Sequence, residues 1–247
     1  MSGHNKWSTI KRKKGALDNK RSHIFTRIIK EITVAVKESG SDPDGNPRLR
    51  LAIQNAKGAN MPKENVQRAI NKAEKEPANL DEVTFEGYGP YGVAFFIECL
   101  TDNNKRTVSN VRNIFTKKNG TLGTNGSLSF IFERKGVITI PKDKITDIEE
   151  FELEIIDVGA EDIENLEDVI VVTTAMEDFG KVRKKLDEMN IEAENAELKR
   201  IPTETKKLEI EQSKKILAMA DLFEEDDDVQ NVFHNLEVTD ELMESME

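Results

Sequence analysis

The 247-residue sequence contains only one cysteine, one tryptophan, two tyrosines and three histidines. A single cysteine, Cys99, excludes disulfides within the chain and is typical of proteins from a reducing compartment. Three histidines and one cysteine also leave few ligands for a zinc site. The longest apolar stretch, residues 92–100, is interrupted by Glu98 and is too short to cross a bilayer. The first twenty residues are basic, without the apolar run of a secretory signal, so we expect a cytoplasmic protein that does not enter a membrane.

Sequence signatures of common catalytic sites are also missing. No Gly-x-Ser-x-Gly, His-Glu-x-x-His or P-loop pattern occurs, and His4, His23 and His234 lie far apart in the sequence. The three glycines of residues 87–92 match a dinucleotide fingerprint, but a strand pattern follows them and Pro90 lacks a backbone donor, which favours a hairpin connection. We therefore predict a protein that is not an enzyme and has no cofactor and no metal.

Charge is distributed unevenly along the chain. The formal net charge is −11, which by itself argues against a nucleic-acid partner. Residues 1–75, however, hold 17 lysines and arginines against 7 acidic residues, whereas residues 141–247 hold 12 against 33. The region between them is neutral, with 7 of each sign. A basic head and an acidic body indicate different roles for the two ends of the chain, and the basic head is suited to bind phosphate.

Apolar spacing predicts three short helices in the basic head. Residues 1–23 have no apolar period and are expected to form a flexible arm, while an apolar stripe from Ile24 to Val36 predicts the first helix. Asn46 and Pro47 are typical of a helix start. The turn at residues 58–62 separates that second helix from a third, which ends near Pro77. These helices predict a small bundle.

The rest of the chain predicts an α+β architecture of two domains. Strands at residues 83–88, 93–100 and 128–132, with a helix at 104–118, give the order strand–strand–helix–strand. Residues 136–201 show the order β-α-β-β-α-β, which is the ferredoxin-like arrangement, with Thr146 and Glu149 as a capping box for its first helix. A later helix and strand, at 208–223 and 229–238, lack partners unless they pack on the middle region, which predicts an inserted domain. The predicted domains are residues 1–78, residues 79–134 with 203–247, and the inserted acidic residues 135–202.

The acidic run of residues 224–228 invites interpretation as a cation site. It lacks the alternating ligands and central glycine of a calcium loop. A solvated helix end is the favoured interpretation.

The basic head carries the strongest functional signal. Its cations cluster around Trp7, which could stack on an unpaired base, and they continue along the polar sides of the helices. The alternatives are an ordinary solvated surface, and a Trp7 that packs on the apolar stripe near Phe25. The candidate nucleic-acid-binding residues are Lys6, Trp7, Lys11, Arg12, Lys13, Lys14, Lys20, Arg21, Arg27, Lys30, Arg48, Arg50, Lys57, Lys63 and Arg68.

Several motifs of this chain resemble the YebC/PmpR family from end to end. The opening Ser2-Gly-His-Asn-Lys-Trp-Ser-Thr-Ile10 is similar to the start of that family, and Glu86-Gly-Tyr-Gly-Pro90 to its hairpin, although the family pattern leads us to expect a glycine at Tyr91. Further matching segments are residues 20–21, 25–27, 60–63, 101–103, 106–107, 129–130, 132–136, 228–232 and 234–235. The resemblance implies a helical domain followed by two α+β domains, with the third inserted into the second.

The resemblance also implies two alternative functions. Bacterial members of the family are usually described as DNA-binding transcriptional regulators, while a mitochondrial relative is described as a translational activator and bacterial members have been linked to the ribosome. We therefore predict a nucleic-acid-binding regulator of gene expression, with DNA as the first target and ribosomal RNA or tRNA on the ribosome as the alternative. A flexible lysine-rich arm suits irregular RNA, whereas operator recognition needs a fixed helix and usually symmetric half-sites.

Partner proteins give a third class of interpretation, in which the acidic domain docks another protein. Salt dependence separates this adaptor from the other two classes, because phosphate binding weakens steeply as salt is added. The sequence shows no heptad seam, so we predict a monomer.

Overall fold

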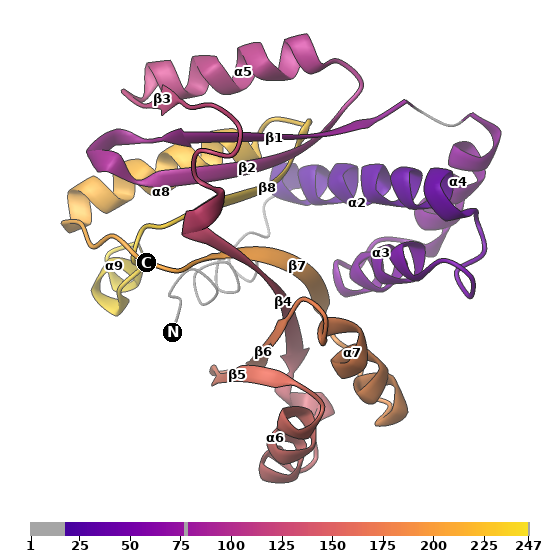
Figure 1. The fold of residues 1–247 in the computed structure, drawn as a ribbon. Coiled ribbons are helices and arrows are strands. Elements are labelled where there is room, and N and C mark those ends of the chain that lie inside the picture. Colours follow the sequence, from indigo (N-terminus) through magenta and orange to yellow (C-terminus); the bar gives the residue numbers. More distant parts are fainter. Residues whose placement is uncertain (1–17, 77–78, 247) are drawn as a thin grey trace. The chain divides into compact units, whose positions relative to one another are not determined.

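The computed structural model describes residues 18–76 and 79–246, and it divides the chain into two compact units. The first unit contains residues 18–30, 79–133 and 200–246, and the second contains residues 31–76 and 134–199. The fold is α+β, as predicted, with helices at the N-terminal end and two four-stranded sheets (Figure 1). Residues 134–199 interrupt the sequence of the first unit. The three predicted domain boundaries stay a prediction.

The first unit is built on a sheet with strand order β3-β1-β2-β8. The pairs β1–β2, β1–β3 and β2–β8 are all antiparallel. Its strands are β1 (Asp81–Tyr88), β2 (Ala94–Thr101), β3 (Thr121–Leu122) and β8 (Val229–His234). Its helices are the start of α2 (Asp18–Ser39), α5 (Asn104–Lys117), α8 (Ile210–Glu224) and α9 (Asp240–Glu244). Two short 3-10 turns are η1 (Pro90–Gly92) and η2 (Ser129–Ile131).

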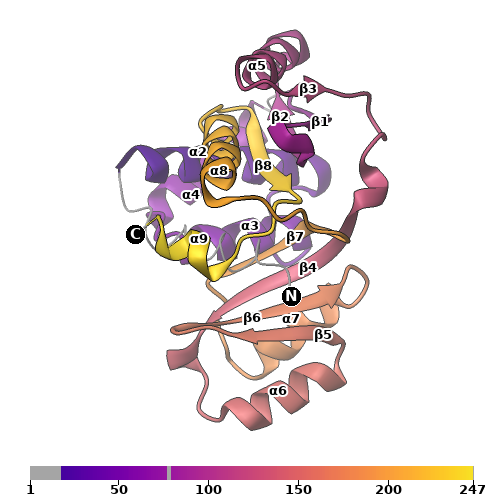
Figure 2. The same ribbon diagram turned by 90° about the vertical axis from the view of Figure 1, so that its left-hand side faces the viewer.

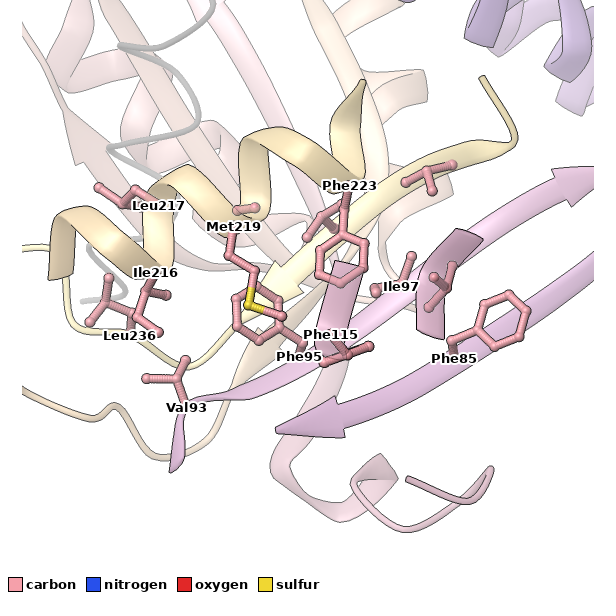
Figure 3. Close-up of a cluster of buried hydrophobic side chains, with 14 of the residues drawn as sticks. Phe85, Val93, Phe95, Ile97, Phe115, Ile216, Leu217, Met219, Phe223 and Leu236 are labelled. Carbon is pink, nitrogen blue, oxygen red and sulfur yellow. The ribbon is translucent and has the colours of Figure 1, made fainter. Parts of the chain in front are cut away.

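Helices α5 and α8 cover one face of this sheet. Phe95 of β2, Phe115 of α5 and Phe223 of α8 form a triangle of rings, with centroids 6.2 Å (Phe95–Phe115), 5.8 Å (Phe95–Phe223) and 5.0 Å (Phe115–Phe223) apart. Figure 3 shows Met219 and Phe223 of α8 directed toward the strand residues Phe95 and Ile97. All of these side chains are buried. Burying an aromatic side chain of this size contributes roughly 1.5–3 kcal/mol, so this cluster stabilises the packing of α5 and α8 on the sheet.

The second unit contains a ferredoxin-like sheet with strand order β5-β6-β4-β7, as predicted. Its core places Phe151 of α6 and Val182 of α7 against Ile138 and Ile170 of the sheet, so both helices cover the same face. Its elements are β4 (Phe132–Pro141), η3 (Lys142–Lys144), α6 (Ile148–Asp157), β5 (Ala160–Asn165), β6 (Val169–Ala175), α7 (Phe179–Glu188) and β7 (Asn195–Pro202). The first two residues of β4, Phe132 and Glu133, and the last three of β7, residues 200–202, belong to the first unit.

The N-terminal helices are α2 (Asp18–Ser39), α3 (Pro47–Gly58) and α4 (Lys63–Lys75). The predicted cap of α3 is confirmed, because the Asn46 side chain accepts a hydrogen bond from the Leu49 backbone N–H at 3.0 Å. Asn46 also donates to the carbonyl oxygens of Ala35 and Gly40. One buried amide therefore joins the end of α2, the loop and the start of α3.

Several predicted boundaries were wrong for local reasons. Helix α2 begins at Asp18, where polar residues hid its first turn. Residues 128–132 alternate in sequence like a strand, but Ser129–Ile131 form the turn η2 and Phe132 is the first residue of β4. Leu128 and Phe132 both pack on the sheet of the first unit, while Phe130 is exposed. The cap of α6 is Asp147, which accepts from the Glu150 N–H, and not Thr146.

Tyr91 occupies a backbone conformation that favours glycine, with a φ of 60°. Left-handed backbone costs a residue with a side chain roughly 1–2 kcal/mol. The predicted departure from the family pattern therefore falls where glycine would be least strained. The Tyr91 hydroxyl receives only a long hydrogen bond, 3.4 Å from Lys215 Nζ.

We expect Tyr91→Gly to raise the free energy of unfolding by about 1 kcal/mol, because relief of strain exceeds the entropy cost of glycine. Urea denaturation measures the change. Asn119→Gly is the matched control, since Asn119 has a φ of 57° but asparagine tolerates this region, so its gain should be smaller. A destabilised Tyr91→Gly variant would contradict the strain argument.

Candidate nucleic-acid interface

Part of the predicted binding surface falls outside the described residues. Lys6, Trp7 and the run Lys11–Lys14 precede residue 18, and the side chain of Lys20 is likewise not described. Their roles stay predictions. The structure therefore bears on Arg21 and the cations that follow it.

Three of those cations contact the protein within the first unit. The Arg21 guanidinium lies over the Phe25 ring, 5.4 Å from its centroid. Arg27 Nη2 donates to the Glu224 carbonyl oxygen at 2.6 Å. Lys30 Nζ donates to the carbonyl oxygens of Leu100 and Asp227 at 2.9 Å and 2.8 Å. These contacts dock the start of α2 on the end of β2 and the turn between α8 and β8.

Asp228 is the centre of that docking site. Its carboxylate accepts from Lys30 Nζ at 2.9 Å, from Arg106 Nη2 at 2.7 Å and from the Thr107 hydroxyl at 2.9 Å. Burial raises the pKa of Asp228, but the hydrogen bonds from Arg106, Lys30 and Thr107 outweigh it and hold the pKa below its usual value. The favoured interpretation of this acidic run as a solvated helix end was therefore wrong for Asp228, which is buried.

The cations of α3 also contact neighbouring groups of the second unit. Arg48 pairs with Glu31 at 2.7 Å and with Glu38 at 2.8 Å. Lys57 pairs with Glu192. Arg50 is exposed, and its guanidinium donates to the carbonyl oxygens of Pro43 and Asp44 at 3.1 Å and 2.8 Å. These contacts give each cation a structural role within the protein.

Lys63 and Arg68 of α4 differ from the other predicted cations. Both side chains are exposed, and neither has a hydrogen-bond or ion-pair partner within the described part of the chain. Helix α4 buries Ala69, Ile70 and Ala73, so its opposite face is directed to solvent. Of the predicted residues with described side chains, these two are the most available to a ligand.

The connection between α3 and α4 has the length of a helix–turn–helix. Residues 59–62 join the two helices, Gly58 ends the first, and Asn60 adopts a φ of 55° to make the turn. Met61 is buried beneath the turn, and Pro62 precedes the first turn of α4. Figure 1 shows α3 and α4 as consecutive helices of the N-terminal region. The turn thus fixes where α4 begins and which face it exposes.

The solvent face of α4 also carries two amides that the sequence interpretation missed. Gln67 and Asn71 are exposed one helical turn apart, and Gln67 Nε2 donates to Asn71 Oδ1 at 3.0 Å. Lys63, Gln67 and Asn71 follow one another at intervals of four, so they share a stripe. Amides at that spacing among cations are a signal the sequence does contain, because glutamine, asparagine, lysine and arginine are the side chains that hydrogen-bond base edges.

A second exposed cationic surface lies on α5 in the first unit. Residues 103–132 hold five lysines and arginines and no aspartate or glutamate. Lys105, Arg112 and Lys117 are exposed and have no partner among the described residues, whereas Arg106 pairs with Asp228. Lys105, Ser109, Arg112 and Thr116 follow one another at intervals of four, three and four, so they share one face of α5. Averaging the charge over residues 76–140 hid this segment.

The described residues provide neither a metal-binding group of histidine, cysteine and carboxylate side chains nor a helix that could span a membrane.

His234 is buried on β8, where its ring lies 5.7 Å from the Phe95 ring. His23 Nδ1 lies 3.2 Å from Asp227 Oδ1. Both contacts explain these histidines as structural residues.

The chain is similar to known proteins along its whole length. A family model described as "TACO1/YebC protein N-terminal domain" matches residues 5–76, and one described as "TACO1/YebC second and third domain" matches residues 80–236. A probable transcriptional regulatory protein of Geotalea uraniireducens is 49% identical, and one of Persephonella marina is 48% identical, each over all of both chains. The solved structure of a conserved hypothetical protein from Aquifex aeolicus is 40% identical, with a TM-score of 0.82 over 92% of this chain and 94% of that one. These matches, over the motifs that fix the hairpin, the Asp228 site and the α3–α4 turn, show that the chain belongs to the TACO1/YebC family.

Proposed function

We propose that this protein is a DNA-binding regulator of transcription, and that α4 is its DNA-reading helix. The carrying observation is the exposed face of α4, which combines free cations at Lys63 and Arg68 with the amides of Gln67 and Asn71. The names of the relatives, probable transcriptional regulatory proteins, support the same function.

The chemistry of α4 suits a DNA groove. In helix–turn–helix proteins the second helix enters the major groove, and residues near its N-terminus contact base edges. Lys63 and Gln67 occupy that end of α4. Lysine and arginine are suited to guanine or phosphate, and glutamine and asparagine to adenine. An exposed helix of this composition meets the requirement of operator recognition for a fixed helix, which supports DNA over the ribosomal alternative.

Selection of duplex DNA by the full-length protein tests the proposal. We expect one sequence to be enriched, and to be bound far more tightly than a scrambled duplex at the same salt concentration. Gln67→Ala should lower that discrimination by about 1–3 kcal/mol, and Lys63→Ala should weaken both duplexes and reduce the salt slope by about one.

Lys184→Ala is the matched control, because Lys184 is also exposed on a helix of the second unit, with 80% of its side chain accessible. It should leave affinity and salt slope unchanged. Failure to enrich any sequence, together with equal losses in Lys63→Ala and Lys184→Ala, would contradict the proposal.

RNA binding is the second candidate function, and the observation that favours it is α5, whose exposed cations lie in a segment, residues 103–132, without aspartate or glutamate. Serine and threonine hydroxyls between cations suit the 2′-hydroxyls and phosphates of an RNA minor groove. Arg112→Ala combined with Lys117→Ala should weaken ribosomal RNA binding and leave duplex DNA binding intact. If the double variant binds RNA as tightly as the unchanged protein, the RNA-binding function of α5 is contradicted.

A further inference from the structure

Helix α6 exposes two aliphatic side chains to solvent. Leu153 is 67% exposed and Ile156 is 54% exposed, whereas Phe151 and Ile155 of the same helix are buried in the core of the second unit. Leu153 and Ile156 are three residues apart and therefore adjoin on the helix surface. Figure 2 shows α6 next to β5. This apolar pair is a feature that neither the fold nor the proposed DNA site uses.

Carboxylates surround Leu153. Its neighbours one helical turn away are Glu149 and Glu150 before it and Asp157 after it, all exposed. The remaining neighbour at that spacing is Ile156. Leu153 thus stands at the middle of a face that is apolar at its centre and negative at its edge.

The negative charge extends well beyond α6. Residues 145–180 contain thirteen aspartates and glutamates and no lysine or arginine. The described ion pairs to this segment come from lysines outside it: Lys185 pairs with Glu154 at 2.8 Å, Lys135 with Glu161 at 2.9 Å and Lys181 with Asp178 at 2.6 Å. Neither Glu154 nor Glu161 adjoins Leu153 on the helix face. The charge around the apolar pair is therefore mainly negative, and Lys185, which pairs with Glu154 and interacts with Asp157, is a cation at its edge.

We propose that this face of α6 docks a cationic segment of a partner protein, with an aliphatic side chain of that segment seated on Leu153 and Ile156. Complementary charge would steer the segment and fix its position, while burial of the apolar pair would supply affinity. Nucleic acid does not fit, because its phosphates would meet the carboxylates. A second copy of the chain does not fit either, since a symmetric contact would place the same carboxylates opposite one another.

Titration of the full-length protein with two peptides tests this inference. One peptide alternates lysine and alanine with two central leucines, and the other replaces those leucines with serine. We expect NMR shift changes at Leu153 and Ile156, and affinity for the leucine peptide at least about tenfold above that for the serine peptide. Leu153→Ser with Ile156→Ser should abolish that preference, and added salt should weaken both complexes.

Ile210→Ser is the matched control, because Ile210 is an exposed aliphatic residue of α8, also beside glutamates. It should leave both affinities unchanged. Equal binding of the two peptides, or shift changes confined to other surfaces, would overturn the inference. Binding that appears only after Lys11–Lys14 are replaced by alanine would assign the face to the chain's own basic arm instead. DNA binding by α4 should be unaffected by these variants, so the two proposals fail separately.

Discussion

Asp228→Ala should lower the free energy of unfolding by about 3 kcal/mol or more, because it leaves Lys30 and Arg106 without their shared buried counter-charge. The side chains of Asp228 and Lys30 are only 5% and 17% exposed, so water cannot replace the lost carboxylate freely. The start of α2 should also detach from β2, since Lys30 loses one of its three acceptors. Chemical denaturation measures the first effect, and hydrogen exchange of residues 21–30 measures the second.

Asp227→Ala is the matched control. The side chain of Asp227 is 71% exposed, and the variant keeps the Asp227 backbone carbonyl that accepts from Lys30. Its effect should stay within about 0.5 kcal/mol. Equal losses from the two variants would contradict the role assigned to Asp228.

The same carboxylate predicts a dependence of stability on pH. Since the pKa of Asp228 is lower in the folded protein than in the unfolded chain, its contribution is complete above the unfolded value of about 3.9 and is lost as pH falls through the folded value. Asp228→Asn should therefore flatten the acid limb of the stability curve. If stability falls equally steeply at low pH in Asp228→Asn and in the unchanged protein, other carboxylates govern the loss of stability in acid.

Gly58→Ala should destabilise the second unit by about 3 kcal/mol, because a Cβ at this position would lie 1.7 Å from the Glu194 carbonyl oxygen. Asn55 adds to the same contact: its side chain donates to the Ala196 carbonyl oxygen at 2.9 Å and accepts from the Ala196 N–H at 3.0 Å. Helix α3 is therefore held directly against the start of β7. The substitution must move the helix or the strand, and thermal unfolding measures the cost.

Gly180→Ala is the contrasting substitution, because nothing lies within 4 Å of its added Cβ in α7. It should stabilise the protein by about 0.5–1 kcal/mol through helix propensity and reduced chain entropy. A Gly58→Ala variant as stable as Gly180→Ala would show that α3 does not pack on β7 as described.

The fold was largely predictable wherever a local pattern reports burial. The stripes that predict α3 and α4, and the β-α-β-β-α-β order, depend on side chains that pack within one element and its neighbours. The strand predicted at residues 128–132 was wrong, because Leu128 and Phe132 pack on the sheet of the first unit without forming one of its strands. Strand β3 has two residues and was missed, since Thr121 and Leu122 are too few to show a period.

The candidate site was predictable only in part. The sequence identified the basic residues but could not distinguish Lys63, which has no side-chain partner within residues 18–76 and 79–246, from Lys30, which is held by carbonyls and a carboxylate about seventy or more positions away in the chain. Such long-range partners leave no local pattern. Gln67 and Asn71, by contrast, stand at helical spacing in the sequence, but they are uncharged and so do not contribute to a pattern based on charge.

Photo-crosslinking of the full-length protein to its selected DNA duplex tests the central claim most directly. With a photoreactive thymine analogue placed across the selected sequence, mass spectrometry should locate the crosslinked peptides within residues 63–75, with Gln67 or Asn71 attached to a base. Lys63→Ala combined with Arg68→Ala should remove those crosslinks, and Lys184→Ala should not. Crosslinks of undiminished yield that lie wholly outside α4 would contradict the account.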